Sequence, residues 1–286
     1  MTEPENHSPP KDLLYLYGFA VSTDLEDIQG TGIDGQSPLF LNRAGNMAAI
    51  LSHASLADFT GDTGEENLGD INWITPRACR HQEVIARVMA RSPVLPVRFG
   101  TLFLTQASLD RTIHTHGAEI TAFLGHVRGR EEWAIKGYMD RKKALKQVAR
   151  DLAAQTAEAP RDRSPDTRAP GTRYFQKKKQ EQEAEQMLKQ AIHTSVMAIA
   201  DILEPLGVDM TERDLMSRAA TGKETDMVLN WAALLEKDEV SRFRNRVDEI
   251  NTAHQQEGLT LEFSGPWPPY SFCPAIGAAD DERAAP

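Results

Sequence analysis

The sequence has only two cysteines, Cys79 and Cys273, in 286 residues. Two thiols are too few for the disulfide framework of a small secreted protein, and they suit a reducing cytoplasm. Long apolar runs are also absent: the longest, 227–235, is interrupted by Asn230 and is about half of the ~20 residues that cross a bilayer. The apolar segment 13–21 is flanked by acids and lacks a small-residue cleavage site, so we expect no secretion signal.

The strings of common catalytic sites are missing as well. The sequence contains neither Gly-x-Ser-x-Gly, which positions a nucleophilic serine, nor the glycine-rich loop ending in Gly-Lys-Ser/Thr that binds phosphates. Cys79 and His81, like His114 and His116, are two residues apart in predicted helices, which directs them about 200° apart around the axis. We therefore expect no enzyme, cofactor or metal site, with Cys79 packed and His81 solvated.

What the sequence has is an ordinary globular composition with uneven charge. Forty per cent of the residues are apolar, 26% are charged, and the formal net charge is −10. Residues 141–179 nevertheless carry 12 Lys and Arg against 4 acids. An acidic chain with one basic segment is poorly suited to general nucleic-acid binding, because the negative charge of the rest of the chain repels the phosphates. The length favours two domains.

The first half of the chain predicts strands followed by helices. We expect strands at 13–20, 37–42 and 47–53, the last two forming a hairpin, and a solvated loop at 58–70 because of its acids and glycines. Thr75-Pro76 predicts a helix start and Ser92-Pro93 its end. In the extended run 94–103, Pro96 indicates an edge or a bulge. Periodic apolar residues predict a helix over 106–126.

The second half predicts the order strand, helix, strand, strand, helix, strand. The expected elements are strands at 131–137, 214–220, 226–235 and 259–263, with helices at 140–154, from Arg173 to before Gly207, and from about Asp238 to Gly258. This is the split βαβ order of a ferredoxin-like sandwich. The predicted class is α+β, with an N-terminal α/β domain at 13–128 and a C-terminal ferredoxin-like domain at 129–272. The tails 1–12 and 273–286 are expected to be disordered, and the insert 155–172 is expected to be mobile.

Three strings occur in order along the chain and together resemble one family. They are Leu-Pro-Val-Arg-Phe-Gly-Thr-Leu-Phe at 95–103, Arg-Tyr-Phe followed by Gln and Lys from 173, and Gly-Pro-Trp-Pro-Pro-Tyr-Ser-Phe at 265–272. Over about 13–272 the sequence resembles the GvpL/GvpF family of gas vesicle proteins. Asn230-Trp231-Ala232 departs from the Tyr-containing apolar strand expected there, and no residue roles are transferred to it.

The resemblance implies a non-enzymatic protein of the cytoplasm and the gas vesicle. It would be an assembly factor or minor structural component whose partners are the small, apolar main shell subunit and other accessory proteins, with no membrane partner. The alternative is a ferredoxin-like regulatory or nucleic-acid-binding protein that uses the basic residues 141–179. We expect the partner interface among residues of the three strings; an alternative role for 267–270 is to staple the two domains together. The candidate interface residues are Arg98, Phe99, Tyr174, Phe175, Trp267 and Tyr270.

Overall fold

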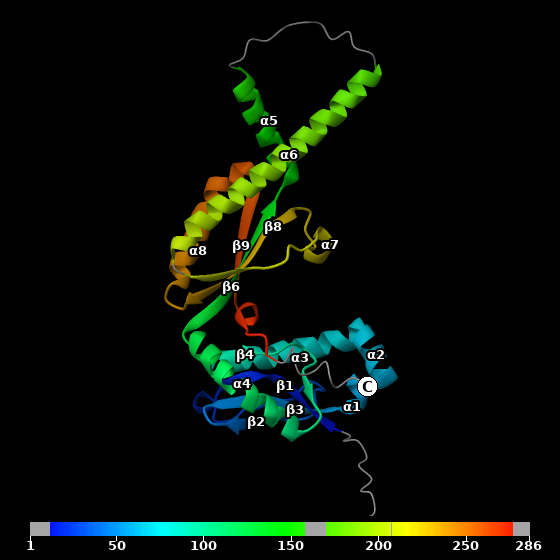
Figure 1. Ribbon diagram of the computed structural model, residues 1–286, viewed down its shortest axis with the longest axis vertical. Helices are drawn as coiled ribbons and strands as arrows, with labels where there is room; N and C mark the ends of the chain where they lie inside the picture. Colours follow the sequence, from blue (N-terminus) through cyan, green and yellow to red (C-terminus); the bar gives the residue numbers. More distant parts are fainter. Residues whose placement is uncertain (1–11, 158–169, 207, 277–286) are drawn as a thin grey trace, which may run out of the picture. The chain divides into compact units, whose positions relative to one another are not determined.

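The computed structural model describes residues 12–157, 170–206 and 208–276, with side chains outside 151–178, 180 and 181. The chain divides into two compact units (Figure 1). The first unit comprises residues 1–132 and 266–286, and the second comprises residues 133–265. Residues 266–272, assigned to the second domain from the sequence, are thus grouped with the first unit.

The first unit contains a five-stranded sheet built around one buried strand. Its strands are β1 (Asp12–Val21), β2 (Leu39–Ala44), β3 (Met47–Ser55), β4 (Val94–Pro96) and β5 (Leu102–Phe103). The order is β2-β3-β1-β4, and β5 also pairs with β1. Strand β1 pairs antiparallel with β3, β4 and β5. The expected hairpin is confirmed: β2 and β3 join through Gly45, whose φ of +59° favours glycine.

The helices of the first unit correct two sequence-based expectations. Residues 58–70 are not a loop: α1 (Leu56–Phe59) and α2 (Gly61–Gly69) occupy them. The next helix, α3 (Ile71–Met89), begins before Thr75-Pro76, because the Asp70 side chain accepts a hydrogen bond from the backbone N–H of Asn72 at 2.9 Å and caps the helix there. Pro76 therefore lies inside α3.

Two long helices bury apolar faces in the first unit. On α3, Val84, Ile85 and Val88 pack in one cluster with residues of β1 and β3. The other helix, α4 (Gln106–His126), has the predicted bounds and buries residues such as Leu109 and Ile120. The predicted edge position of Pro96 is also confirmed, because β4 ends the strand order.

The second unit has a four-stranded sheet in the order β7-β8-β6-β9. Its elements are β6 (Arg130–Met139, which begins in the first unit), α5 (Arg141–Ala157), α6 (Pro170–Leu203), β7 (Asp209–Glu212), α7 (Arg218–Thr221), β8 (Asp226–Glu236), α8 (Val240–His254) and β9 (Leu259–Trp267). The strand predicted at 214–220 is wrong. The strand lies earlier, at β7, and Ser217 caps the short helix α7 by accepting a hydrogen bond from Ala220 N–H.

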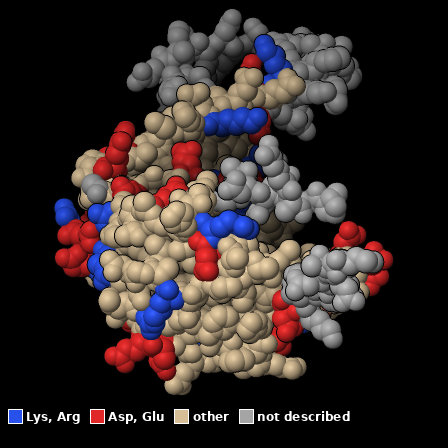
Figure 2. All heavy atoms as spheres, turned by 60° about the horizontal axis from the view of Figure 1, so that its bottom comes forward, with Lys and Arg blue, Asp and Glu red and all other residues tan. Residues whose placement is uncertain are grey.

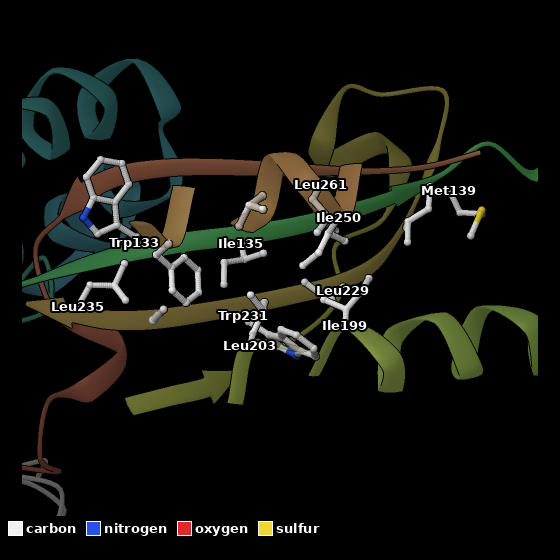
Figure 3. Packing of buried hydrophobic residues seen from close by; sticks show 14 of the residues in the cluster. Trp133, Ile135, Met139, Ile199, Leu203, Leu229, Trp231, Leu235, Ile250 and Leu261 are labelled. Carbon is white, nitrogen blue, oxygen red and sulfur yellow. The ribbon is translucent and has the colours of Figure 1, made fainter. Parts of the chain in front are cut away.

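An apolar core fills the second unit between the sheet and its helices (Figure 3). Trp133 and Ile135 on β6 and Trp231 on β8 pack with Leu203 of α6 and Ile250 of α8. Because strand residues alternate between faces while helix residues recur every three or four positions, these side chains converge on one layer. The protein is thus a mixed helix-and-sheet molecule with two antiparallel sheets.

Candidate interaction site

From the last two residues of β9 onward, the chain forms a short segment held by hydrogen bonds within the first unit. We call residues 266–276 the C-terminal strap. Gln82 Nε2 donates to the Tyr270 hydroxyl at 3.0 Å. The backbone N–H and hydroxyl of Ser271 donate to the Glu132 carboxylate at 2.9 and 2.8 Å. Pro268 and Pro269 are buried, so the strap is anchored on both sides of Tyr270.

The strap reaches a buried histidine whose hydrogen bonds define its tautomer. His81 is 1% exposed, and its Nε2 lies 3.1 Å from the carbonyl oxygen of Val97. Since a carbonyl can only accept, Nε2 carries the proton, and Nδ1 accepts from the Tyr15 hydroxyl at 2.9 Å. The Tyr15 oxygen accepts in turn from Gly100 N–H at 3.1 Å. The Tyr270 oxygen lies 3.4 Å from Nε2, beside this chain of bonds.

These groups are held in their neutral forms. Burial lowers the pKa of His81 to about 4 and raises the pKa of Tyr270 to about 12. Burial also raises the pKa of the Cys273 thiol to about 12. Near pH 7 these three side chains therefore offer hydrogen bonds and no charge, which suits a structural connection. The expectation that Cys79 packs and His81 is solvated is wrong, because Cys79 is the exposed one.

Aromatic rings surround His81 and fix the turn that follows β4. The Tyr17 ring stacks on the imidazole at a centroid distance of 5.5 Å, and the Phe99 ring meets it edge-on at 6.0 Å. Phe99 also lies 6.2 Å from the Tyr15 ring. Edge-on and offset arrangements match the charge distribution of aromatic rings. Phe99 is therefore part of the packing of the turn.

The six candidate interface residues fall into three groups. Phe99 and Tyr270 are brought together around His81, where both are partly buried. Arg98 and Trp267 lie on the surface, and Trp267 is 50% exposed. The side chains of Tyr174 and Phe175 lie outside the described residues.

The edge at β4 is less open to another strand than its position in the sheet implies. Pro96 has no N–H to donate, and its carbonyl oxygen lies 3.7 Å from the Cys273 thiol of the strap, a weak hydrogen bond. Strand addition at Pro96 would therefore have to displace the strap.

Sequence reasoning missed His81, Tyr15 and Glu132 as members of this site. A signal for His81 was present: it stands four residues before Ile85, so the helical period places both on the buried face of α3. The contacts of Tyr270 had no such signal, because they join residues 188 and 189 positions apart.

Within 12–157, 170–206 and 208–276, no group of three or more His, Cys, Asp or Glu is arranged to hold a metal ion. No helix in those ranges combines the length and apolar character required to cross a membrane.

Known proteins resemble this chain over nearly its whole length. The family model for "Gas vesicle synthesis protein GvpL/GvpF" matches residues 13–274. The chain belongs to the GvpL/GvpF family of gas vesicle proteins. Gas vesicle protein L1 of Halobacterium salinarum is 25% identical over 92% of this chain and 91% of its own. Gas vesicle protein L of a Streptomyces species is 26% identical over 93% of this chain and 94% of its own.

Solved structures of GvpF share the fold. GvpF from Anabaena sp. PCC7120 superposes with a TM-score of 0.67 at 19% identity, over 92% of this chain and 98% of that one. GvpF from Microcystis aeruginosa gives a TM-score of 0.61 at 20% identity, over 92% and 99% of the two chains. The GvpL/GvpF family is structural or accessory and is not a known class of enzyme. A role connected with gas vesicles follows.

Proposed function

We propose that this protein is an accessory protein of gas vesicle formation that binds the main shell subunit, as an assembly factor or minor shell component. The proposal is supported by the family match together with the half-exposed Trp267 of the C-terminal strap. A small, strongly apolar subunit must be shielded before assembly, and a protein that covers its apolar face would prevent random aggregation. Such a protein would act in the cytoplasm and at the gas vesicle.

One observation carries the proposal: a half-exposed tryptophan stands immediately before an anchored segment. Trp267 is 50% exposed, while the next two residues are buried prolines and Tyr270 is hydrogen-bonded to Gln82. A tryptophan held in place loses little conformational entropy on binding, and tryptophan is enriched among residues that dominate binding energy. We therefore assign Trp267 and Arg98 as contact residues, with Phe99 and Tyr270 positioning them.

Replacing Trp267 tests this assignment. We expect Trp267→Ala to remain folded and to weaken binding of the purified main shell subunit about tenfold or more, as hot-spot truncations do. The matched control is Leu104→Ala, because Leu104 is an exposed apolar residue of the same unit, 57% exposed. Equal binding by wild type and Trp267→Ala, measured by pull-down and by titration, would contradict the assignment.

A second variant separates positioning from contact. Tyr270→Phe removes the hydroxyl that accepts from Gln82 but keeps the ring. We expect this variant to lower the thermal stability of the first unit and to weaken shell binding less than Trp267→Ala does. A Tyr270→Phe protein that is fully stable and binds as weakly as Trp267→Ala would make Tyr270 a contact residue instead.

We also propose that the chain is an N-terminal α/β domain followed by a ferredoxin-like domain. The support is the sheet order β7-β8-β6-β9 with helices between β6 and β7 and between β8 and β9. If these four strands are numbered 1 to 4 in chain order, the order across the sheet is 2-3-1-4, which is the arrangement of a split βαβ sandwich.

A further inference from the structure

Helix α2 and the start of α3 carry exposed acids beside exposed apolar side chains. We call residues 62–71 the acidic lobe. Asp62, Glu65 and Glu66 are exposed, and their spacing of three and four residues places them on one face of α2. Leu68 is 45% and Ile71 is 69% exposed. On the side of Figure 2 where α2 lies in Figure 1, the visible charged side chains are acidic.

In the second unit, α5 presents charges of the opposite sign. Lys142, Lys143, Lys146 and Arg150 are all exposed, and we call them the basic stripe. Their spacing keeps them on one side of the helix over more than two turns. Between Arg141 and Arg150 the helix contains no acid.

Neither surface is neutralised by its own chain within the described residues. No ion pair in that part of the structure involves the three α2 acids or the four cations of the basic stripe, whereas Arg141 beside them is paired with Glu185. The side chains of the basic stripe can also cover apolar neighbours, since Lys and Arg pack their methylene stems on apolar surface while their charged ends stay in water. The basic stripe therefore complements both the carboxylates and the exposed Leu68 and Ile71.

We propose that the acidic lobe of one copy of this chain binds the basic stripe of a second copy. Charge complementarity identifies this occupant: both surfaces occur once in every chain, in similar numbers of opposite charges, with an apolar element that lysine stems can cover. The contact joins two different surfaces, so it is head-to-tail, and it extends into rings or filaments as copies are added. It uses neither Arg98 nor Trp267 and is independent of the proposed shell binding.

Salt dependence is the first test of the proposal. Sedimentation of the full chain at about 20 mM and about 0.3 M salt compares weak with strong screening of surface charges. We expect concentration-dependent assemblies larger than a dimer at low salt and monomers at high salt. A wild-type chain that stays monomeric at low salt, or whose assembly ignores salt, would overturn the proposal.

Charge reversal is the second and sharper test. Variant X carries Glu65→Lys and Glu66→Lys, and variant Y carries Lys142→Glu and Lys146→Glu. Each alone should raise the dissociation constant of self-association at least about tenfold, because like charges then face each other. An equal mixture of X and Y should associate again, as should one chain carrying all four changes.

The reversed pairs make the outcome decisive. Recovery in the mixture supports direct contact of the two surfaces, while a mixture that stays monomeric overturns it. Circular dichroism checks folding, and a reversal that unfolds the chain is replaced by its neutral pair, either Glu65→Gln with Glu66→Gln or Lys142→Gln with Lys146→Gln. Either neutral variant should weaken self-association at low salt, and unchanged association would overturn the proposal as well.

Discussion

The two units differ in how many polar residues they bury and in the hydrogen bonds that these residues make. Among the described residues, five of the six buried polar or charged residues, including His81 and Glu132, lie in the first unit, and only Asn230 lies in the second. His81 and Glu132 have hydrogen-bond partners from distant parts of the chain. The Asn230 Oδ1 atom, by contrast, is buried without a partner in the described part of the structure. The first unit thus buries more polar side chains than the second, in which Asn230 Nδ2 donates to the Asp214 carbonyl oxygen and Asn251 bonds the Leu261 backbone.

Apolar truncation should affect the two units alike. Ile50 in the first unit and Ile135 in the second are both 0% exposed and belong to the respective cores. We expect Ile50→Ala and Ile135→Ala each to lower the free energy of unfolding of the unit concerned by about 2–5 kcal/mol, since each leaves a cavity. Urea unfolding followed by hydrogen exchange in each unit measures both. A loss below about 1 kcal/mol in either unit would contradict the assigned cores.

Removal of one tyrosine hydroxyl should lower the free energy of unfolding of the first unit, whereas the matching change in the second unit should not. Tyr15→Phe leaves His81 Nδ1 and Gly100 N–H without their partner, which at about 1–3 kcal/mol per group suggests a loss of about 2–6 kcal/mol. The matched control is Tyr138→Phe in the second unit, whose hydroxyl has no hydrogen bond within the described residues. We expect the control to stay within about 0.5 kcal/mol of the wild type. Equal losses would remove the contrast between the units.

Acid should weaken the first unit through His81. Its pKa is lowered by burial to about 4 in the folded protein, while the unfolded chain keeps the ordinary value near 6.5. The unfolded chain therefore binds more protons between these values, and the stabilising contribution is complete above pH 6.5 and lost as pH falls toward 4. This costs the folded state about 2 kcal/mol at pH 5. His81→Gln should flatten the stability profile between pH 7 and 5, and an unchanged slope would show that His81 does not cause it.

Much of the fold follows from local pattern. Strand β1 and helix α4 were predicted almost to the residue because aromatic and aliphatic residues repeat at strand or helix period with clear ends. Residues 58–70 were mistaken for a loop because their many acids and glycines are typical of loops. The two short helices there bury only Phe59 and Gly64, which is too few residues to show a helical period. Strand β7 was missed because only four residues, Asp209–Glu212, pair with β8.

The site was less predictable than the fold. Trp267 and Tyr270 were singled out from an aromatic, proline-rich string, but no local rule shows that one stays exposed while the other is tied to Gln82 and His81. Long-range hydrogen bonds depend on the assembled first unit, not on spacing along the chain.

Deleting the gene tests the central claim most directly, namely that this chain serves gas vesicle formation by binding protein partners. We expect cells that lack it to lose flotation and gas vesicles visible by electron microscopy. The wild-type gene and Leu104→Ala should restore both, and Trp267→Ala should restore them poorly despite equal protein levels. Normal flotation of the deletion strain would contradict the account.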